Sequence, residues 1–209
     1  TQLKMKGQNI SSVAIVGAAS PIGRFLISRL NSSGRRFFAI GRRHRDLDGF
    51  AVHRFDDVAG RFEPPIHQAD AIINCAPLPT IGTALDMAAC IGAWRIIAFG
   101  STGRFSKLNS SSPVERDFVN QQVEAEERFK RSCRQQGIAW TLFRPTMIYG
   151  AGSDLNVSFI GKFILRFRFF PVPNGANGLR QPVHADDLAA ACIAALACER
   201  TFGRSYNLG

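Results

Sequence analysis

Five short apolar segments alternate with longer amphipathic segments along the chain, and this alternation restricts the fold more than any other sequence feature. The apolar segments have the length and the bounding residues of buried strands. They are VAIVG (13–17), RFFAIG (36–41), DAIINCA (70–76), RIIAFG (95–100) and AWTLFRP (139–145). The amphipathic segments have helical length and cover residues 21–33, 81–92, 113–136, 154–168 and 185–199. Short strands that alternate with helices form βαβ units, whose right-handed crossovers place helices on both faces of a parallel sheet. The sequence therefore predicts an α/β fold with a doubly wound parallel sheet in three αβα layers.

Length and composition are those of one globular domain. The chain has 209 residues, of which 45% are hydrophobic and 20% are charged, a balance typical of folded proteins. No repeat or linker divides it, so residues 1–209 are expected to form a single domain. The N-terminus is polar, and no apolar run approaches the roughly 20 residues of a membrane span. Five scattered cysteines show no disulfide pattern and four histidines show no metal-ligand spacing, so we expect a soluble, cytoplasmic, metal-free protein.

The net charge of +10 suits an anionic partner. Nucleic acid, an acidic membrane surface and phosphorylated small molecules all fit this sign. The basic residues form only small groups, such as Arg42 with Arg43, and no nucleic-acid-reading motif is present. We therefore expect a basic surface and an anionic small-molecule substrate rather than nucleic-acid binding.

The first strand-to-helix connection carries a binding motif, Gly17-x-x-Ser20-x-x-Gly23. Backbone N–H groups in such a loop, together with the helix N-terminus, suit a pyrophosphate. Serine stands at the middle position, where glycine is usual, and is small enough for a phosphate to approach. A plain tight turn is the alternative, but the position after the first strand favours an NAD(P)-binding Rossmann fold. The expected cofactor contacts in this loop are Gly17, Ala19, Ser20, Pro21, Ile22 and Gly23.

Charged residues bear on the choice of dinucleotide at two places, the end of the second strand and the stretch HRFDDVAG (53–60), which would contain a further strand between 36–41 and 70–76. The second strand ends with Arg42 and Arg43, and the first carboxylate beyond them is that of Asp46. Guanidinium groups suit a 2′-phosphate, whereas a carboxylate suits a free 2′-hydroxyl. NADP is therefore favoured over NAD, with a solvated charge cluster as the alternative. Asp56 is the expected adenine contact, and Asp57 replaces it if the register differs by one residue.

Five motifs in the same order resemble those of the short-chain dehydrogenase/reductase superfamily, in particular its extended and atypical branch of nucleotide-sugar epimerases and dehydratases. GAASPIG resembles the glycine motif and DAIINCAP the fourth-strand motif. FRPTMIYGAG, GLRQPVHADDLAAA and SYNLG resemble the arginine–proline, the basic–histidine–acidic and the last-strand segments. The resemblance runs from about residue 12 to the C-terminus. It implies that the cofactor also contacts Cys75, Ala76, Pro77, Pro145, Thr146 and Ile148.

The resemblance implies a catalytic set that this chain carries only in part. The family uses a tyrosine as general acid/base, a lysine four residues later that lowers the tyrosine pKa and binds the ribose, and a serine or threonine that hydrogen-bonds the reacting oxygen. Ser101 matches the serine, and Thr102 is the adjacent alternative, here also assigned to the substrate. The chain has two tyrosines, Tyr149 and Tyr206, and both belong to other motifs.

The helix expected to carry the tyrosine and lysine reads FVNQQVEAEERFK (118–130). Aligning the family's glutamate with Glu126 places Phe118 at the tyrosine position and Gln122 at the lysine position. Aligning it with Glu127 places two valines there, which fits less well. Phenylalanine cannot transfer a proton and glutamine carries no charge, but the Gln122 amide can still hydrogen-bond the ribose.

Residues 150–181 form a candidate substrate-side segment within the domain. By resemblance, Asn156 takes a substrate-side polar position and Arg180 a position that contacts the substrate diphosphate. The stretch FIGKFILRFRFF (159–170) alternates cationic and aromatic residues. A helix that covers the substrate cleft, with Phe159, Phe163 and Phe167 packed inward, is favoured over a basic amphipathic helix on an anionic membrane. A dimer contact is a third interpretation, so a homodimer stays open.

Two functions fit these features. The first is an NADP-dependent oxidoreductase or epimerase/dehydratase that acts on a nucleotide sugar, with Ser101 and an unidentified base. His184, Asp186 and Asp187 are near one another in sequence, but His184 fits better as the cap of the helix at 185–199. The second is a non-catalytic NAD(P)-binding sensor or accessory protein, which the absence of the tyrosine and lysine favours.

Overall fold

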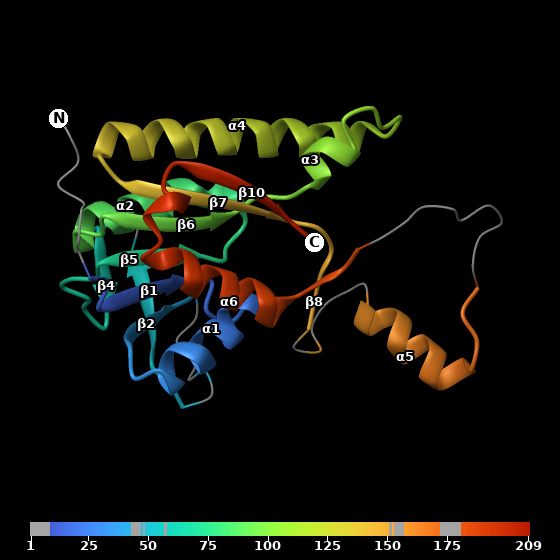
Figure 1. The fold of residues 1–209 in the computed structure, drawn as a ribbon, viewed down its shortest axis with the longest axis horizontal. Coiled ribbons are helices and arrows are strands. Elements are labelled where there is room, and N and C mark those ends of the chain that lie inside the picture. The colour runs from blue at the N-terminus through green and yellow to red at the C-terminus, as the bar shows by residue number, and fades with distance from the viewer. Residues whose placement is uncertain are drawn as a thin grey trace.

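A central sheet of eight strands organises the computed structural model (Figure 1), which describes residues 9–42, 47, 49–56, 58–150, 152, 157–171 and 181–209. The strand order is β10-β7-β6-β5-β1-β2-β3-β4. The bounds are β1 Ser12–Val16, β2 Arg36–Ile40, β3 Val52–Asp56, β4 Arg61–Glu63, β5 Ala71–Asn74, β6 Arg95–Phe99, β7 Ala139–Pro145 and β10 Arg204–Leu208. Every neighbouring pair is parallel except the β3–β4 hairpin at one edge. The predicted α/β fold with a doubly wound, mostly parallel sheet is confirmed.

Helices cover both faces of this sheet (Figure 1). Helices α1 (Pro21–Ser32) and α6 (Ala185–Leu196) pack on one face, and α2 (Ile81–Ile91) and α4 (Pro113–Gln136) pack on the other. Shorter elements connect them: η1 Leu78–Thr80, α3 Gly103–Ser106, η2 Glu199–Thr201 and a separate parallel pair of β8 Ile148–Tyr149 with β9 Val183–His184. The helix α5 (Val157–Phe167) completes the set. None of the helices in the described part of the chain is long and apolar enough to cross a membrane.

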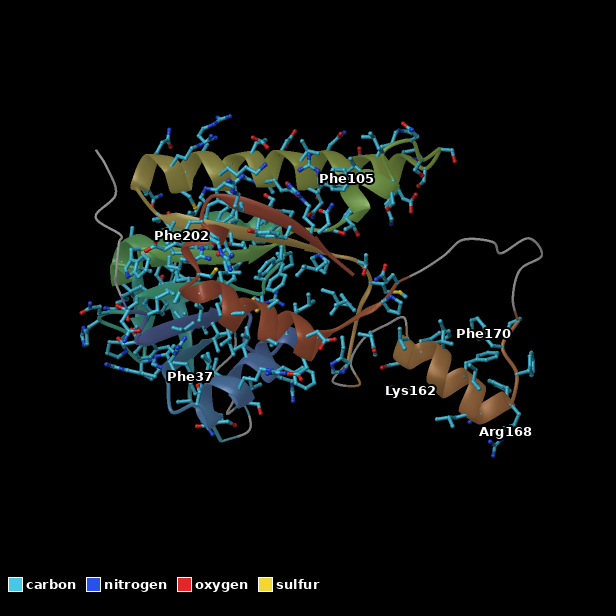
Figure 2. The ribbon with its side chains drawn as sticks, viewed as in Figure 1. Phe37, Phe105, Lys162, Arg168, Phe170 and Phe202 are labelled. Carbon is cyan, nitrogen blue, oxygen red and sulfur yellow. The ribbon has the colours of Figure 1, made fainter. Side chains whose placement is uncertain are left out.

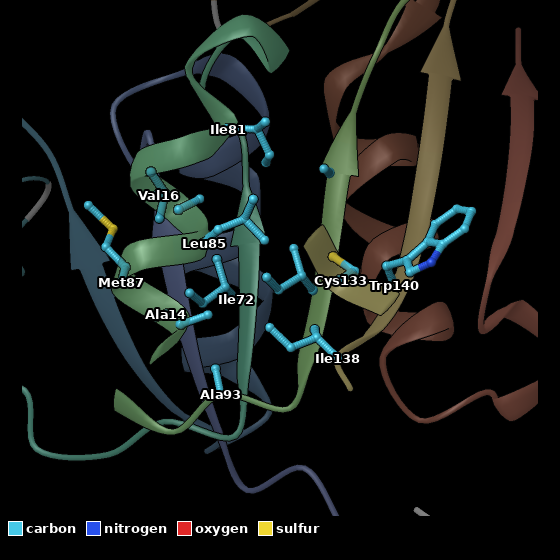
Figure 3. Packing of buried hydrophobic residues seen from close by; sticks show 14 of the residues in the cluster. Ala14, Val16, Ile72, Ile81, Leu85, Met87, Ala93, Cys133, Ile138 and Trp140 are labelled. Carbon is cyan, nitrogen blue, oxygen red and sulfur yellow. The ribbon is translucent and has the colours of Figure 1, made fainter. Parts of the chain in front are cut away.

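Each face of the sheet has its own apolar core. Figure 3 shows part of the core under α2, where Ile72 of the sheet packs with Ile81 and Leu85. On the other face, Leu26 and Leu30 of α1 are fully buried four residues apart, as helical periodicity requires. Helices α2 and α4 end at Gly92 and Gly137, whose φ values of 67° and 68° are left-handed.

A buried arginine fixes the end of the sheet opposite the expected site. Arg95 on β6 has no exposed surface. Its guanidinium donates to the carbonyls of Ala195 and Leu196 at the end of α6, to those of Ile96 and Ala139, and to the hydroxyls of Thr141 and Thr201. Burial lowers the pKa of Arg95 to about 10. Six acceptors compensate for the desolvation of this cation and tie α6 to β6 and β7.

Helix α5 differs from its expected packing. It stands away from the sheet in Figure 1, and Phe159 and Phe167 are 61% and 48% exposed. The prediction that Phe159 and Phe167 pack inward over a cleft is therefore wrong. Periodicity located the apolar face of the helix correctly, but it carries no information on what covers that face.

Candidate functional site

The glycine loop lies where β1 meets α1, next to the end of β5. Gly17 has a φ of 75°, and a Cβ there would lie 3.0 Å from the backbone nitrogen of Ala76. A Cβ on Gly23 would lie 2.5 Å from the carbonyl oxygen of Ala18. Close backbone approach therefore requires glycine at both positions. The loop sits at the topological switch point, since β2 and β5 flank β1 on opposite sides.

Ser20 occupies the middle position of the loop without strain. Its φ of −68° and ψ of 160° are extended, so the position does not need glycine. The hydroxyl caps α1 by accepting a hydrogen bond from the Gly23 N–H at 3.1 Å. Ala19 is exposed and Pro21 half-buried, whereas the side chain of Ile22 is buried in the core. Any contact of Ile22 with a phosphate would therefore use its backbone.

Cys75 lies directly beneath this loop. Burial raises the pKa of its thiol to about 12, against a smaller lowering by the Ser20 hydroxyl that hydrogen-bonds it. The thiol is therefore neutral and acts as a small packing group rather than a nucleophile. The next residue, Ala76, is half-buried, and Pro77 is exposed at the start of η1.

The residues expected around the adenosine half are described in part. Arg42 is exposed directly after β2, whereas Arg43 and Asp57 lie outside the described residues. Asp56 Oδ1 accepts hydrogen bonds from the N–H groups of Val58 and Ala59 at 2.9 and 3.0 Å. These two bonds lower the pKa of Asp56. Its carboxylate thus shapes the β3–β4 turn, a structural role that the sequence did not reveal.

The structure brings Ser101 and Phe118 together across Gly103. Ser101 Oγ accepts a hydrogen bond from the Gly103 N–H at 3.0 Å. A Cβ on Gly103 would lie 3.0 Å from Ser101 Oγ and 3.1 Å from Phe118 Cε1. The ring of Phe118 therefore lies beside the serine, as the alignment on Glu126 expects, whereas Val119 from the other alignment is only 3% exposed.

Gln122 lies one helical turn after Phe118 and is 7% exposed. Among the residues that the structure describes, its Oε1 is the single buried side-chain oxygen or nitrogen without a hydrogen-bond partner. A buried acceptor without a hydrogen bond destabilises a folded protein by about 1–3 kcal/mol, and such groups are therefore rare. A ligand that brings a hydroxyl donor to this position would supply the missing hydrogen bond, and a ribose is such a ligand.

Glu126, one turn further along α4, anchors the helix beneath the site. Its carboxylate has no exposed surface and accepts from Arg144 Nε at 2.9 Å and Nη2 at 2.6 Å. Arg104 Nη1 donates to the same carboxylate. A Cβ on Gly100 would lie 3.0 Å from Glu126 Oε1. The backbone directly after β6 therefore lies close to this carboxylate. Arg104 of α3 and Arg144 of β7 thus hold α4 in place through one buried carboxylate.

The segment after β7 is held by backbone bonds. Thr102 donates to the carbonyl of Pro145 from both its N–H and its hydroxyl, each at 3.1 Å. Thr146 N–H donates to the Leu208 carbonyl at 2.9 Å, and its hydroxyl donates to the Gln181 carbonyl. Because the Thr102 hydroxyl is engaged in this way, Ser101 is the better candidate to contact a substrate. Asn156 and Arg180 lie outside the described residues, whereas Ile148 is half-buried in β8.

His184 caps α6 as the sequence suggested. Its Nδ1 accepts from the Asp186 N–H at 3.2 Å, and its ring packs between Phe25 and Tyr149 at centroid distances of 5.2 and 5.0 Å. Asp186 forms two hydrogen bonds of 2.5 and 2.7 Å with Arg29, which lower its pKa. Both side chains are thus committed to holding α6 against α1.

Comparison with known proteins decides the family. The model of the NAD dependent epimerase/dehydratase family matches residues 83–209, which is more than half of the chain. The chain belongs to the NAD-dependent epimerase/dehydratase family. The uncharacterized protein y4nG of Sinorhizobium fredii is 27% identical to it over 144 residues, which cover 66% of this chain and 35% of that protein. The chain thus spans about a third of the length of this relative.

Solved structures share the fold of this family member at low sequence identity. The epimerase Mth375 of Methanothermobacter thermautotrophicus gives a TM-score of 0.77 at 14% identity, over 96% of this chain and 72% of that one. The UDP-glucose 4-epimerase of Thermotoga maritima, solved with UDP-glucose, gives 0.71 at 15% identity, over 95% and 76%. The UDP-glucose 4-epimerase of Thermus thermophilus, solved with NAD, gives 0.69 at 18% identity, over 95% and 77%.

Lys107 lies beside this candidate site, although no sequence motif indicates it. Its Nζ lies 5.6 Å from the centroid of the Phe118 ring and 3.0 Å from Glu115 Oε1. An ammonium therefore stands beside the position at which the family carries its tyrosine. The contact joins the end of α3 to the first turns of α4, so no fixed sequence spacing marks it. The arginine at position 104 was missed for the same reason.

Proposed function

We propose that this chain binds a nicotinamide dinucleotide across the carboxyl ends of β1, β5, β6 and β7. The pyrophosphate would lie at the N-terminus of α1, against the backbone of residues 17–23. The nicotinamide half would contact residues 75–77 and 145–148. The observation that carries the proposal is the buried, unpartnered Oε1 of Gln122, one turn from Phe118. A ribose hydroxyl would satisfy that oxygen without the lysine that the family normally places there.

NADP is the proposed cofactor of choice, with NAD as the alternative. Arg42 supports this preference because it is exposed directly after β2, where a 2′-phosphate would approach, and Arg43 follows it in sequence. Asp56 is proposed to contact the adenine in addition to shaping its turn. We expect the protein to act in the cytoplasm, where its five cysteines stay reduced.

The proposed reaction is an oxidoreduction or an epimerase/dehydratase step on a nucleotide sugar. The net charge of +10 supports an anionic substrate, and the similar epimerase of Thermotoga maritima was solved with UDP-glucose. When bound, the nicotinamide would accept and return a hydride. Ser101 would hydrogen-bond the reacting oxygen, and Lys107 would bring an N–H donor and a positive charge to the side of Phe118. The residues between 150 and 181, with Asn156 and Arg180, would complete the substrate side of a single domain.

A second function is favoured by one observation. Phe118 places an apolar ring beside Ser101, at the position where the family carries an ionisable phenol. General acid–base catalysis is worth roughly 10²–10⁴-fold, so its loss would suit a cofactor-binding sensor or accessory protein rather than an efficient enzyme.

Calorimetric titration with NADP and then NAD tests the proposal. Saturable binding of NADP that is tighter than that of NAD is expected, and the Gly23→Ala variant should abolish both because its Cβ cannot be accommodated. A folded wild-type protein that binds neither dinucleotide contradicts the proposal. If NADP binds, turnover of UDP-glucose by the wild type and by Phe118→Tyr/Gln122→Lys separates the two functions. Activity only in the double variant favours the sensor.

A further inference from the structure

Helix α5 carries an apolar face that the structure leaves open to solvent. Phe159, Ile164 and Phe167 are 61%, 42% and 48% exposed, and no residue of the helix is buried. Phe159, Phe163 and Phe167 recur every four residues, so their rings follow one side of the helix. Neighbouring rings lie 6.4 and 4.6 Å apart. An exposed stripe of this kind is rare on a soluble surface and marks a site of interaction.

The chain after α5 enlarges the same face. Arg168 has a φ of 62°, a left-handed conformation that ends the helix and reverses the chain. Phe169 and Phe170 consequently return to the Phe163 ring, with centroid distances of 5.9 and 5.8 Å. A non-glycine residue in this conformation costs about 1 kcal/mol. The turn therefore gathers five phenylalanines on one short segment, two of them from outside the helix.

Every charged group described between residues 157 and 171 is a cation. These groups are Lys162, Arg166 and Arg168, and the sequence contains no aspartate or glutamate in this range. Lys162 and Arg166 are one turn apart and exposed along one edge of the apolar face, and the Arg166 guanidinium lies 5.5 Å from the centroid of the Phe167 ring. Figure 2 shows Lys162, Arg168 and Phe170 on this segment, which stands apart from the sheet.

This combination favours one occupant, an anionic lipid surface. An apolar aromatic face flanked by cations is typical of a helix that lies in the headgroup region, with rings toward the acyl chains and cations toward the phosphates. A second copy of the chain fits less well, because it would bring two such cationic helices together without an acidic residue from either. We propose that α5 and the turn after it dock the protein on an anionic membrane surface without spanning it.

Vesicle sedimentation of the full chain tests the docking surface. Wild-type protein should sediment with phosphatidylglycerol vesicles and remain in solution with phosphatidylcholine vesicles. Replacing Lys162, Arg166 and Arg168 with serine should weaken binding on the order of 100-fold, since each cation near an anionic surface contributes roughly fivefold. The Phe159→Ser/Phe167→Ser variant should also lose binding. A matched control replaces three exposed arginines elsewhere, Arg131, Arg134 and Arg204, with serine and should bind nearly as wild type does.

Three outcomes would overturn this assignment. One is wild-type protein that ignores phosphatidylglycerol vesicles. Another is equal loss of binding in the α5 and control charge variants, which would assign binding to the overall charge of +10. The third is a dimer in size-exclusion chromatography that Phe159→Ser/Phe167→Ser dissociates while vesicles bind none of the proteins. None of these outcomes depends on NADP binding, which calorimetry measures separately. The cofactor proposal and the membrane proposal can therefore be refuted independently.

Discussion

Replacing Gln122 with methionine should move stability and cofactor affinity in opposite directions. The methionine side chain has a similar length and lacks the amide, so the change removes the unpartnered Oε1 from a position that is 7% exposed. Relief of a buried unsatisfied acceptor is worth about 1–3 kcal/mol, and taking the lower end to allow for imperfect packing predicts a gain of about 1 kcal/mol. In a chain of this size that gain raises Tm by roughly 2–4 °C.

The same change should weaken NADP binding. One lost ribose hydrogen bond of about 0.5–1.5 kcal/mol corresponds to a rise in Kd of roughly 2- to 12-fold. Thermal melts followed by circular dichroism measure the first effect, and calorimetric titration measures the second. The neighbouring Gln121 is exposed on the same helix, and Gln121→Met should change neither quantity. A Gln122→Met protein that melts earlier and binds NADP as tightly as wild type would refute the reasoning, because Gln122 would then be a structural residue.

Other perturbations test other parts of the molecule. Arg95→Met should lower the free energy of unfolding in urea by about 3 kcal/mol or more, since it leaves several buried acceptors unpaired; Arg131→Met, at an exposed position, should change it by less than about 0.5 kcal/mol. Burial alone would raise the pKa of Asp70, but hydrogen bonds from Ser11 and Ser12 together outweigh it and lower the pKa. The contribution of Asp70 to stability is therefore present above a pH of about 4 and lost as the pH falls through the folded pKa. In the Asp70→Asn variant, Tm should therefore decrease less between roughly pH 5 and 3 than it does in the wild type. An equal decrease in both proteins would show that Asp70 does not contribute to the pH dependence of stability. Arg42→Ala should raise the Kd for NADP by about tenfold and leave that for NAD unchanged, a selectivity that calorimetry reads directly. Lys107→Met should leave NADP binding intact but weaken UDP-glucose binding to the NADP complex by about 3- to 10-fold, and equal titrations would exclude the lysine from the site.

Local features of this site were readable from the sequence. The glycine loop is set by residues within one strand-to-helix connection, and Ser20 fits there because its backbone is extended and does not require glycine. The family resemblance also associated Ser101 with Phe118, because it assigns both positions to one catalytic set. These two residues meet across Gly103 in the structure.

Features that depend on distant segments were not readable. The pairing of Glu126 with Arg104 joins residues 22 apart, and the contact of Lys107 with Phe118 depends on how a short loop turns. Asp56 was predicted to contact the adenine, but an aspartate at the end of a strand can equally accept hydrogen bonds from the turn that follows. The β4 strand has three residues, too few to show any periodicity.

The packing of α1 against α6 has a consequence for how the chain folds. Arg29 near the end of α1 pairs with Asp186 at the start of α6, a separation of 157 residues. The core on this face contains Leu26 from the first helix and Leu188 from the last. During synthesis, the part of α1 that packs on α6 therefore stays uncovered until residues 185–196 have been made. Contacts of such long range slow folding and leave apolar surface open in the meantime.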